Sequence, residues 1–386
     1  MPANMNIENT KTNENEIYWD AEFLQKLLIE AITEVIRDEC VSDEQLSKLS
    51  ETIGNEVEPI SNSVAKILYK ALRKRMNHML RSQRRAYKGF EKRHYLRWKE
   101  GIDFLEAFMV LAYELGANFN QQYRIEASNT QDYLFEALTR LHARAVQIGF
   151  EVLLLLSKGF ADGAHARWRS AHEIAIVSNF LATNGQDVAK RYLDYEVIES
   201  YEAMRQFQKY AESLGYDKFP EEDLAHLRKI CESLAEKYGP SYYNEHKYNE
   251  HGWAAKALGK EGRKDRVKIS DIEKAVELDH YRPYYRMASQ NIHASPKGSR
   301  IRLGLRSGEE LLLAGPSNYG LFDPAYGIAV SVLQSTVPLL TMKKSLDAIV
   351  MSKVLEKYVA NIENAFGKVD NEMKKENEKL GNMDKE

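Results

Sequence analysis

The sequence predicts an all-α protein, a multi-helix bundle with a separate N-terminal helical region. Apolar residues recur at helical spacing through most of the 386 residues. The 9 prolines and 21 glycines are too few for a β-sandwich or barrel, which needs a turn roughly every 8–12 residues. Hydrophobic residues make up 44% of the chain, which is enough for a sizeable core and excludes a wholly disordered protein.

Few, long helices are expected in the N-terminal part. Residues 16–37 carry an apolar stripe at helical spacing, and Ser42 is typical of the cap that opens a second, short helix. No proline interrupts residues 60–126, where we expect one or two long helices. Asn129 and Thr130 then predict the cap of the next helix, over 131–158.

The remaining chain predicts shorter helices separated by loops. We expect helices over 161–182, 187–213, 221–238, 270–278, 281–293, 323–338 and 345–367, with Pro338 kinking or ending its helix. Glycine and proline mark 239–268 and 295–322 as irregular. The predicted organisation is an N-terminal region over 1–128, a helical domain over 129–362 and a charged, frayed tail over 363–386.

Charge is unevenly distributed although the whole chain sums to −3. Residues 1–62 carry 4 basic and 14 acidic side chains, whereas residues 66–99 carry 13 basic side chains and one acid, Glu91. The basic segment predicts contact with the phosphates of RNA. The candidate nucleic-acid-binding residues are Arg73, Lys74, Arg75, Arg81, Arg84, Arg85 and Arg93. Two alternatives stay open: the acidic segment folds back and neutralises the basic one, or a protein partner binds there.

Aromatic residues lie between these basic side chains. They could stack on bases or belong to the core. The residues are Tyr69, Tyr87, Phe90, Tyr95 and Trp98.

Several other classes are excluded or disfavoured. Only Cys40 and Cys231 are present, which excludes a disulfide scaffold and a cysteine zinc site. No run reaches 18 apolar residues and the first 15 residues are polar, so we expect no membrane segment, no signal peptide and a cytoplasmic location. We expect no cofactor and no metal, because no Walker A motif or paired Glu-x-x-His motif occurs, and the histidine–acid pairs in loops lack convergent partners.

The densest polar cluster lies in an otherwise apolar stretch. It consists of His165, Arg167, Arg169, His172 and Glu173. At helical spacing, His165, Arg169 and His172 share one stripe, and Arg169 can pair with Glu173 at i, i+4. The alternative is a buried structural ion pair of Arg169 with Glu173 or with Glu151.

The spacing Arg167-x4-His172 resembles the Arg-x4–6-His pattern of the HEPN ribonuclease superfamily, although Trp168 stands where a small polar residue is common. The resemblance implies an all-α, metal-independent enzyme. In such an enzyme the histidine would be general acid or base at the ribose 2′-OH, and the arginine would stabilise the phosphate charge. Arg167 and His172 lie about 140° apart on one helix. They would therefore meet through bound substrate or across a homodimer interface.

A second match to this pattern is Arg286-x6-His293. Arg286, Ser289 and His293 share one helix face at i, i+3 and i+7. The alternative is that His293 only stabilises the end of its helix by facing the C-terminal dipole.

The stretch Gly159–Glu173, with Glu151 upstream, resembles a bacterial domain-of-unknown-function family, number 5677 in its series. So do Gly252-Trp253-Ala254 and Tyr285-x3-Ser289-x3-His293 downstream. The resemblance covers about 130–345 and implies a helical bundle, some of whose relatives lie near phage-defence or toxin-like genes. The residues that it implicates are Glu151, Arg169, Glu173, Ser289 and His293.

We therefore expect a HEPN-like endoribonuclease, acting as a toxin or in anti-phage defence, with RNA affinity supplied by residues 66–99. The expected catalytic residues are Arg167, Arg169, His172, Glu173 and His293, supported by Glu151, Ser289 and Arg286. The competing hypothesis is a non-catalytic helical module that binds nucleic acid or protein, or acts as a sensor, and whose polar cluster is structural.

Overall fold

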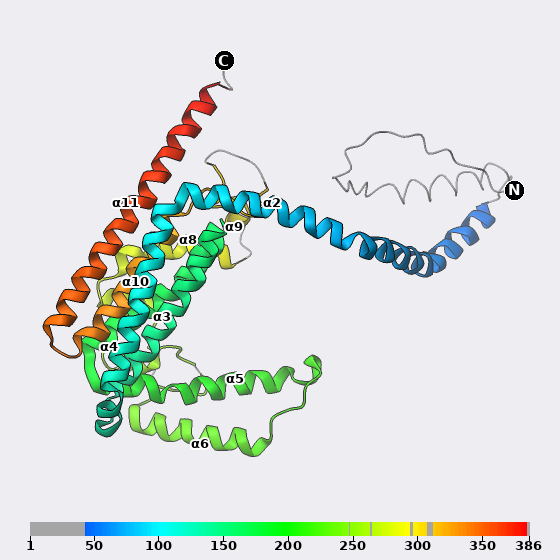
Figure 1. Ribbon diagram of the computed structural model, residues 1–386. Coiled ribbons are helices and arrows are strands. Elements are labelled where there is room, and N and C mark those ends of the chain that lie inside the picture. Colours follow the sequence, from blue (N-terminus) through cyan, green and yellow to red (C-terminus); the bar gives the residue numbers. More distant parts are fainter. Residues whose placement is uncertain (1–42, 247, 263–264, 294–295, 307–311, 384–386) are drawn as a thin grey trace. The chain divides into compact units, whose positions relative to one another are not determined.

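The computed structural model describes residues 43–246, 248–262, 265–293, 296–306 and 312–383 (Figure 1). These residues form helices joined by loops and contain no strand, so the predicted all-α fold is confirmed. The chain divides into two compact units, Met1–Arg85 and Ala86–Glu386. The predicted helix over 16–37 lies outside the described residues.

Helix α2 (Asp43–Thr130) combines two predicted elements, the short helix after Ser42 and the long helix over 60–126. In the second unit its apolar stripe is buried, from Trp98 through Ala112. In the first unit the apolar residues of α2 keep the same helical spacing, but Leu72, one of them, is exposed. The predicted domain boundary near residue 128 falls at the end of this helix, whereas the two units meet between Arg85 and Ala86.

Three helices form the centre of the second unit, and each packs against the other two: α3 (Tyr133–Ser157), α4 (Ala161–Asp194) and α10 (Phe322–Thr341). Helix α3 begins where the Asp132 carboxylate accepts a hydrogen bond of 2.9 Å from the backbone N–H of Phe135. The cap is therefore Asp132. The predicted cap, Asn129 and Thr130, forms the last turn of α2 instead.

Gly185 interrupts α4 close to where the sequence predicts that a helix ends. Its φ of 75° is a conformation that favours glycine, and a second helical segment then runs to Asp194. Helix α5 (Glu196–Tyr210), the short η1 (Glu212–Leu214) and α6 (Glu221–Tyr238) follow. The bounds of α6 agree with the prediction, because proline and three acidic residues mark its start and Gly239 its end.

The segment after α6 consists of short helices and loops. The predicted irregular stretch 239–268 contains only η2 (Gly252–Ala254) among its described residues, and α7 (Ile269–Ala275) and η3 (Asp279–Tyr281) follow it. Helix α8 (Arg282–Ile292) packs against α4. The predicted loop 295–322 begins with a short helix, α9 (Pro296–Arg300).

The last helix, α11 (Leu346–Met383), is longer than predicted, and the expectation of a frayed tail is wrong for its described residues. Two features stabilise α11 beyond residue 367. Met373 is buried in the core. Lys374 pairs with Asp370 at 2.6 Å, at i, i+4 spacing. Pro338 lies buried inside α10 and does not end it.

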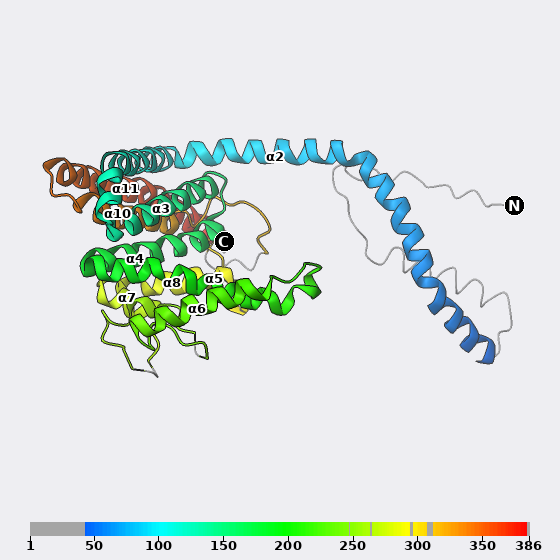
Figure 2. The same cartoon turned by 90° about the horizontal axis from the view of Figure 1, so that it is seen from below.

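In the second unit, α10 lies between α11 and α4, and α7 and α8 cover another side of α4 (Figure 2). The α5–α6 pair forms an antiparallel hairpin beside this core (Figures 1 and 2). Helix α4 is therefore covered on several sides by other helices.

Candidate functional site

The most connected polar cluster joins α4 to α8. Nε of Arg169 donates to the Ser289 hydroxyl at 3.1 Å, and its guanidinium pairs with Glu173 at 3.1 Å, one turn along α4. The hydroxyl of Tyr285 accepts from Arg169 at 2.5 Å and donates to Glu173. The structure thus brings together three residues that the family resemblance implicated, with Tyr285 at their centre.

This cluster is partly open to solvent. The side chains of Arg169 and Glu173 are 27% and 34% exposed, whereas Tyr285 is buried. Burial and the bond to Glu173 raise the pKa of Tyr285, so its hydroxyl stays a donor at neutral pH. The Arg169 guanidinium also lies 4.5 Å from the centre of the Tyr285 ring, in a cation–π contact. Each of the four side chains forms at least one hydrogen bond within the cluster, and these bonds join α8 to α4.

His172, the expected acid or base, is a core residue. It is 1% exposed, and its Nε2 lies 3.1 Å from the carboxylate of Glu273, which is fully buried and pairs with Arg282. The rings of Trp168 and Tyr285 pack around it. Burial, and then the charge of Arg282, lowers the pKa of His172 to about 4.

The expected proton transfer by His172 requires contact with substrate, and this placement offers none. The sequence predicts that His172 acts together with the other candidate catalytic residues. The structure gives it a separate, enclosed site built around Glu273.

Arg167 belongs to neither group. It pairs with Glu151 of α3 and donates to Ser170 at 3.4 Å. The side chains of Arg167 and Glu151 are partly exposed. This pair matches the structural alternative of an ion pair to Glu151, but formed by Arg167 rather than Arg169.

His293 and Arg286 lie exposed on or beside α8. His293 is the C-terminal cap residue of this helix, and its backbone N–H donates to the carbonyl of Ser289 at 3.2 Å. The predicted catalytic and supporting residues are thus distributed over three paired clusters and one exposed helix end.

Sequence reasoning missed two residues at the centre of these clusters. Glu273 lies 101 residues from His172 along the chain, and no local spacing connects them. Tyr285 occurs in the motif that carries the family resemblance, but its role depends on the packing of α8 on α4.

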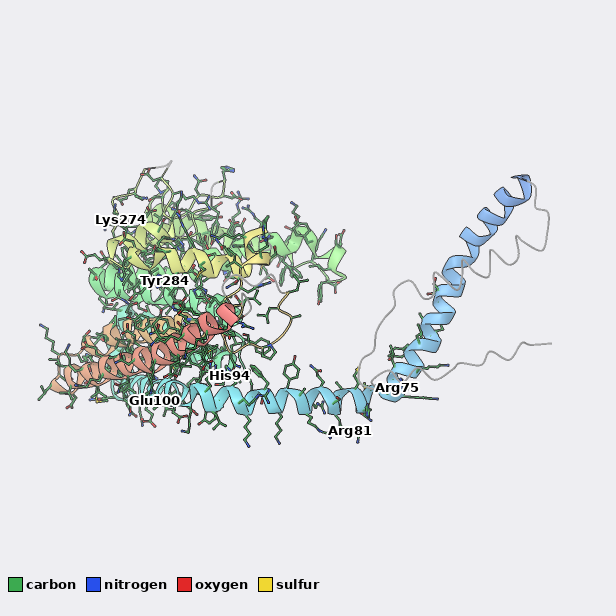
Figure 3. The ribbon with its side chains drawn as sticks, turned by 90° about the horizontal axis from the view of Figure 1, so that it is seen from above. Arg75, Arg81, His94, Glu100, Lys274 and Tyr284 are labelled. Carbon is green, nitrogen blue, oxygen red and sulfur yellow. The ribbon has the colours of Figure 1, made fainter. Side chains whose placement is uncertain are left out.

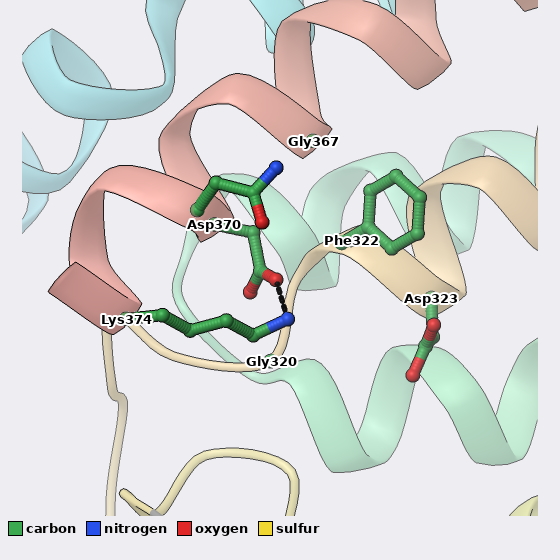
Figure 4. A pocket seen from close by; sticks show the side chains of 7 residues that line it. Gly320, Phe322, Asp323, Gly367, Asp370 and Lys374 are labelled. Carbon is green, nitrogen blue, oxygen red and sulfur yellow. Dashed lines mark ion pairs between the residues drawn. The ribbon is translucent and has the colours of Figure 1, made fainter.

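The structure also reveals a polar hollow at the start of α10. Figure 4 shows Asp370 of α11 paired with Lys374 at 2.6 Å, with Asp323 of α10 nearby. Its volume is about 330 Å³, and Gly320 and Phe322 form part of its wall. Burial and the charge of Asp370 raise the pKa of Asp323. Lys374 already neutralises Asp370. Of the described residues, no group of three or more His, Cys, Asp or Glu side chains is arranged to hold a metal ion.

The predicted nucleic-acid-binding residues are all exposed on α2, and Arg75 and Arg81 project outward from the helix (Figure 3). Successive residues of an α-helix lie 100° apart around its axis. Seven of the basic residues between Lys66 and Arg85 therefore fall within an arc of about 120°. We call this the basic face; it consists of Lys66, Lys70, Arg73, Lys74, Arg81, Arg84 and Arg85. Arg75 lies outside it, and Arg93 lies further along the helix in the second unit.

None of the seven predicted nucleic-acid-binding side chains forms an ion pair with a described carboxylate. The aromatic residues of this region divide into two groups. Tyr69 and Tyr95 are 64% and 39% exposed, whereas Trp98 is a core residue. Tyr87 and Phe90 are partly buried, and Phe90 stacks on His94. Of these five residues, Tyr69 and Tyr95 are the most open to a base.

None of the described helices combines the length and the apolar composition that a bilayer-spanning segment requires. No curated protein and no solved structure shows a significant match to this chain. Residues 135–310, less than half of the chain, contain the clusters built on α3, α4, α7 and α8. This segment matches the model of the family of unknown function DUF5677, which confirms the predicted resemblance to that family over these residues.

Proposed function

We propose that this protein binds RNA through the basic face of α2, and that the polar clusters of the second unit hold its helices together. The observation that carries the proposal is the basic face itself: seven exposed cationic side chains within about 120° of one helix, none paired with a described carboxylate. A row of this kind attracts a phosphate backbone by charge, with release of condensed counterions.

The exposed ring of Tyr69 supports a single-stranded ligand, because an unpaired base can stack on an aromatic side chain. The clusters of the second unit support a structural role. His172 is enclosed, and Arg169, Glu173 and Tyr285 satisfy one another.

The test is fluorescence anisotropy with a labelled single-stranded RNA at several salt concentrations. We expect the triple variant Arg73→Gln, Arg81→Gln, Arg84→Gln to bind more weakly. The slope of log K against log salt should fall by about 2, since each lost phosphate contact removes about 0.7 for single strands.

The matched control, Lys229→Gln, Lys274→Gln, Lys357→Gln, removes the same charge from exposed positions elsewhere and should leave the slope unchanged. An equal loss in both variants would contradict the proposal. So would a preference for vesicles of anionic lipid over RNA.

A second candidate function is the HEPN-like endoribonuclease, which would cleave RNA at the ribose 2′-OH without a metal ion. The observation that favours it is the exposure of both Arg286 and His293. In this version His293, rather than His172, would serve as acid or base, with Arg286 at the phosphate. For this candidate function we also predict that the protein forms a homodimer and acts as a toxin or in phage defence.

The endoribonuclease is tested by incubating RNA with the intact chain in EDTA. Cleavage that leaves 2′,3′-cyclic phosphate ends, is lost in His293→Ala and persists in His226→Ala would support it; His226 is an exposed histidine of α6. Cleavage that is equal in the two variants would contradict the assignment to His293. RNA binding without cleavage would favour the first proposal.

A further inference from the structure

A groove between α2 and α3 lies apart from all the clusters described above. It has a volume of about 340 Å³, and its walls come from residues 113–120 of α2 and 139–150 of α3. None of the side chains that line it carries a formal charge when its histidine, His142, is neutral. The groove belongs entirely to the second unit.

Small residues keep this groove open. Gly116 faces the ring of His142 so closely that a Cβ at this position would lie 2.2 Å from Cε1 and 2.3 Å from Nδ1. Ala117 and Ala143 line the groove and are exposed, so no large side chain fills it from either helix. The ring edge of His142 that carries Nδ1 therefore faces the wall formed by Gly116.

The hydrogen bonds of His142 define which ring nitrogen is free. The Thr336 hydroxyl donates to the carbonyl of Val332 at 2.7 Å, so its oxygen accepts the bond of 3.1 Å from His142 Nε2. Nδ1 is then the unprotonated nitrogen and an acceptor. It has no partner among the described residues, although His142 is only 4% exposed. Burial lowers the pKa of His142 to about 4 and keeps the ring neutral.

Aromatic side chains frame the opening of the groove. Tyr113 on α2 and Phe150 on α3 are 57% and 38% exposed, although both line the cavity. A concave site lined mainly by apolar and aromatic side chains, with a few uncharged polar groups among them, is typical of a small-molecule site.

We propose that this groove binds a neutral, planar aromatic molecule that donates a hydrogen bond to Nδ1 of His142. The uncharged lining disfavours ionic ligands, because an unpaired charge loses its hydration there. Tyr113 and Phe150 offer faces for ring contacts. Nδ1 of His142, an acceptor with no partner among the described residues, requires an N–H or O–H donor on the ligand.

Indole is a suitable probe, because it is neutral, planar and carries one N–H. We expect saturable binding of indole to the intact chain by isothermal titration calorimetry, with a dissociation constant on the order of 0.1 mM for a ligand of this size. 1-Methylindole has nearly the same shape without the donor and should bind about three- to tenfold more weakly.

Ala143→Trp fills the groove from an exposed position and should abolish indole binding. The matched control is Ala203→Trp, the same change at an exposed alanine of α5, which should bind indole like the unaltered protein. Circular dichroism would verify that both variants are folded. The proposal is overturned if indole shows no saturable binding up to its solubility limit, if Ala143→Trp binds it normally, or if 1-methylindole binds equally well.

Discussion

Acidification should destabilise this protein in a way that depends on His142. The ring is buried between α3 and α10, with Thr336 as its hydrogen-bond partner. Burial alone lowers the pKa of His142 from 6.5 to about 4. The perturbation that isolates this residue is His142→Gln, which keeps a polar side chain able to donate to Thr336 but removes the titrating group.

The direction in which the free energy of unfolding changes with pH follows from proton binding to the folded and unfolded chains. Between about pH 6.5 and about pH 4, the unfolded chain binds a proton at this histidine that the folded chain does not, so the free energy of unfolding falls as the pH drops. Above about pH 7, protonation of His142 causes no loss in the free energy of unfolding. The loss reaches about 2 kcal/mol at pH 5 and about 3 kcal/mol once the pH is below 4.

The assay is urea unfolding of both proteins, followed by circular dichroism, at about pH 8 and about pH 5. The two buried histidines His165 and His172, whose pKa values are also lowered to about 4, titrate in both proteins and cancel in the comparison. We expect the destabilisation caused by His142→Gln to be about 2 kcal/mol smaller at pH 5 than at pH 8. A destabilisation that is the same at both pH values would refute the reasoning.

Three further predictions concern stability. Glu273→Ala should lower the free energy of unfolding by about 3–5 kcal/mol, because it leaves Arg282 without its buried partner, and Glu273→Gln should cost less; urea unfolding would measure both. Gly320→Ala should cost about 2 kcal/mol or more, since φ is 76° and a Cβ would lie 2.3 Å from the carbonyl oxygen of Leu303; an unchanged melting temperature would contradict this. Truncation after residue 367 should lower the melting temperature, because it removes buried Met373; a melting temperature equal to that of the full chain would contradict this.

Much of the fold follows from local sequence signals. The bounds of α6 were predictable because proline, acidic residues and a terminal glycine all act within a few residues of the helix ends. The length of α11 was not, because the burial of Met373 depends on packing against other helices, while the local sequence there is mostly charged. The cap at Asp132 was missed because Asn129 and Thr130 offer the same local chemistry three and two residues earlier.

The helical class, the basic segment of α2 and the grouping of Arg169 with Glu173 could be predicted from local sequence, because helical periodicity fixes neighbours three and four residues apart. The contact of Tyr285 with this pair, and the position of His172 in the core against Glu273, could not. These contacts join residues more than 100 positions apart. Such contacts depend on how α4, α7 and α8 pack together, and no single helix encodes that packing.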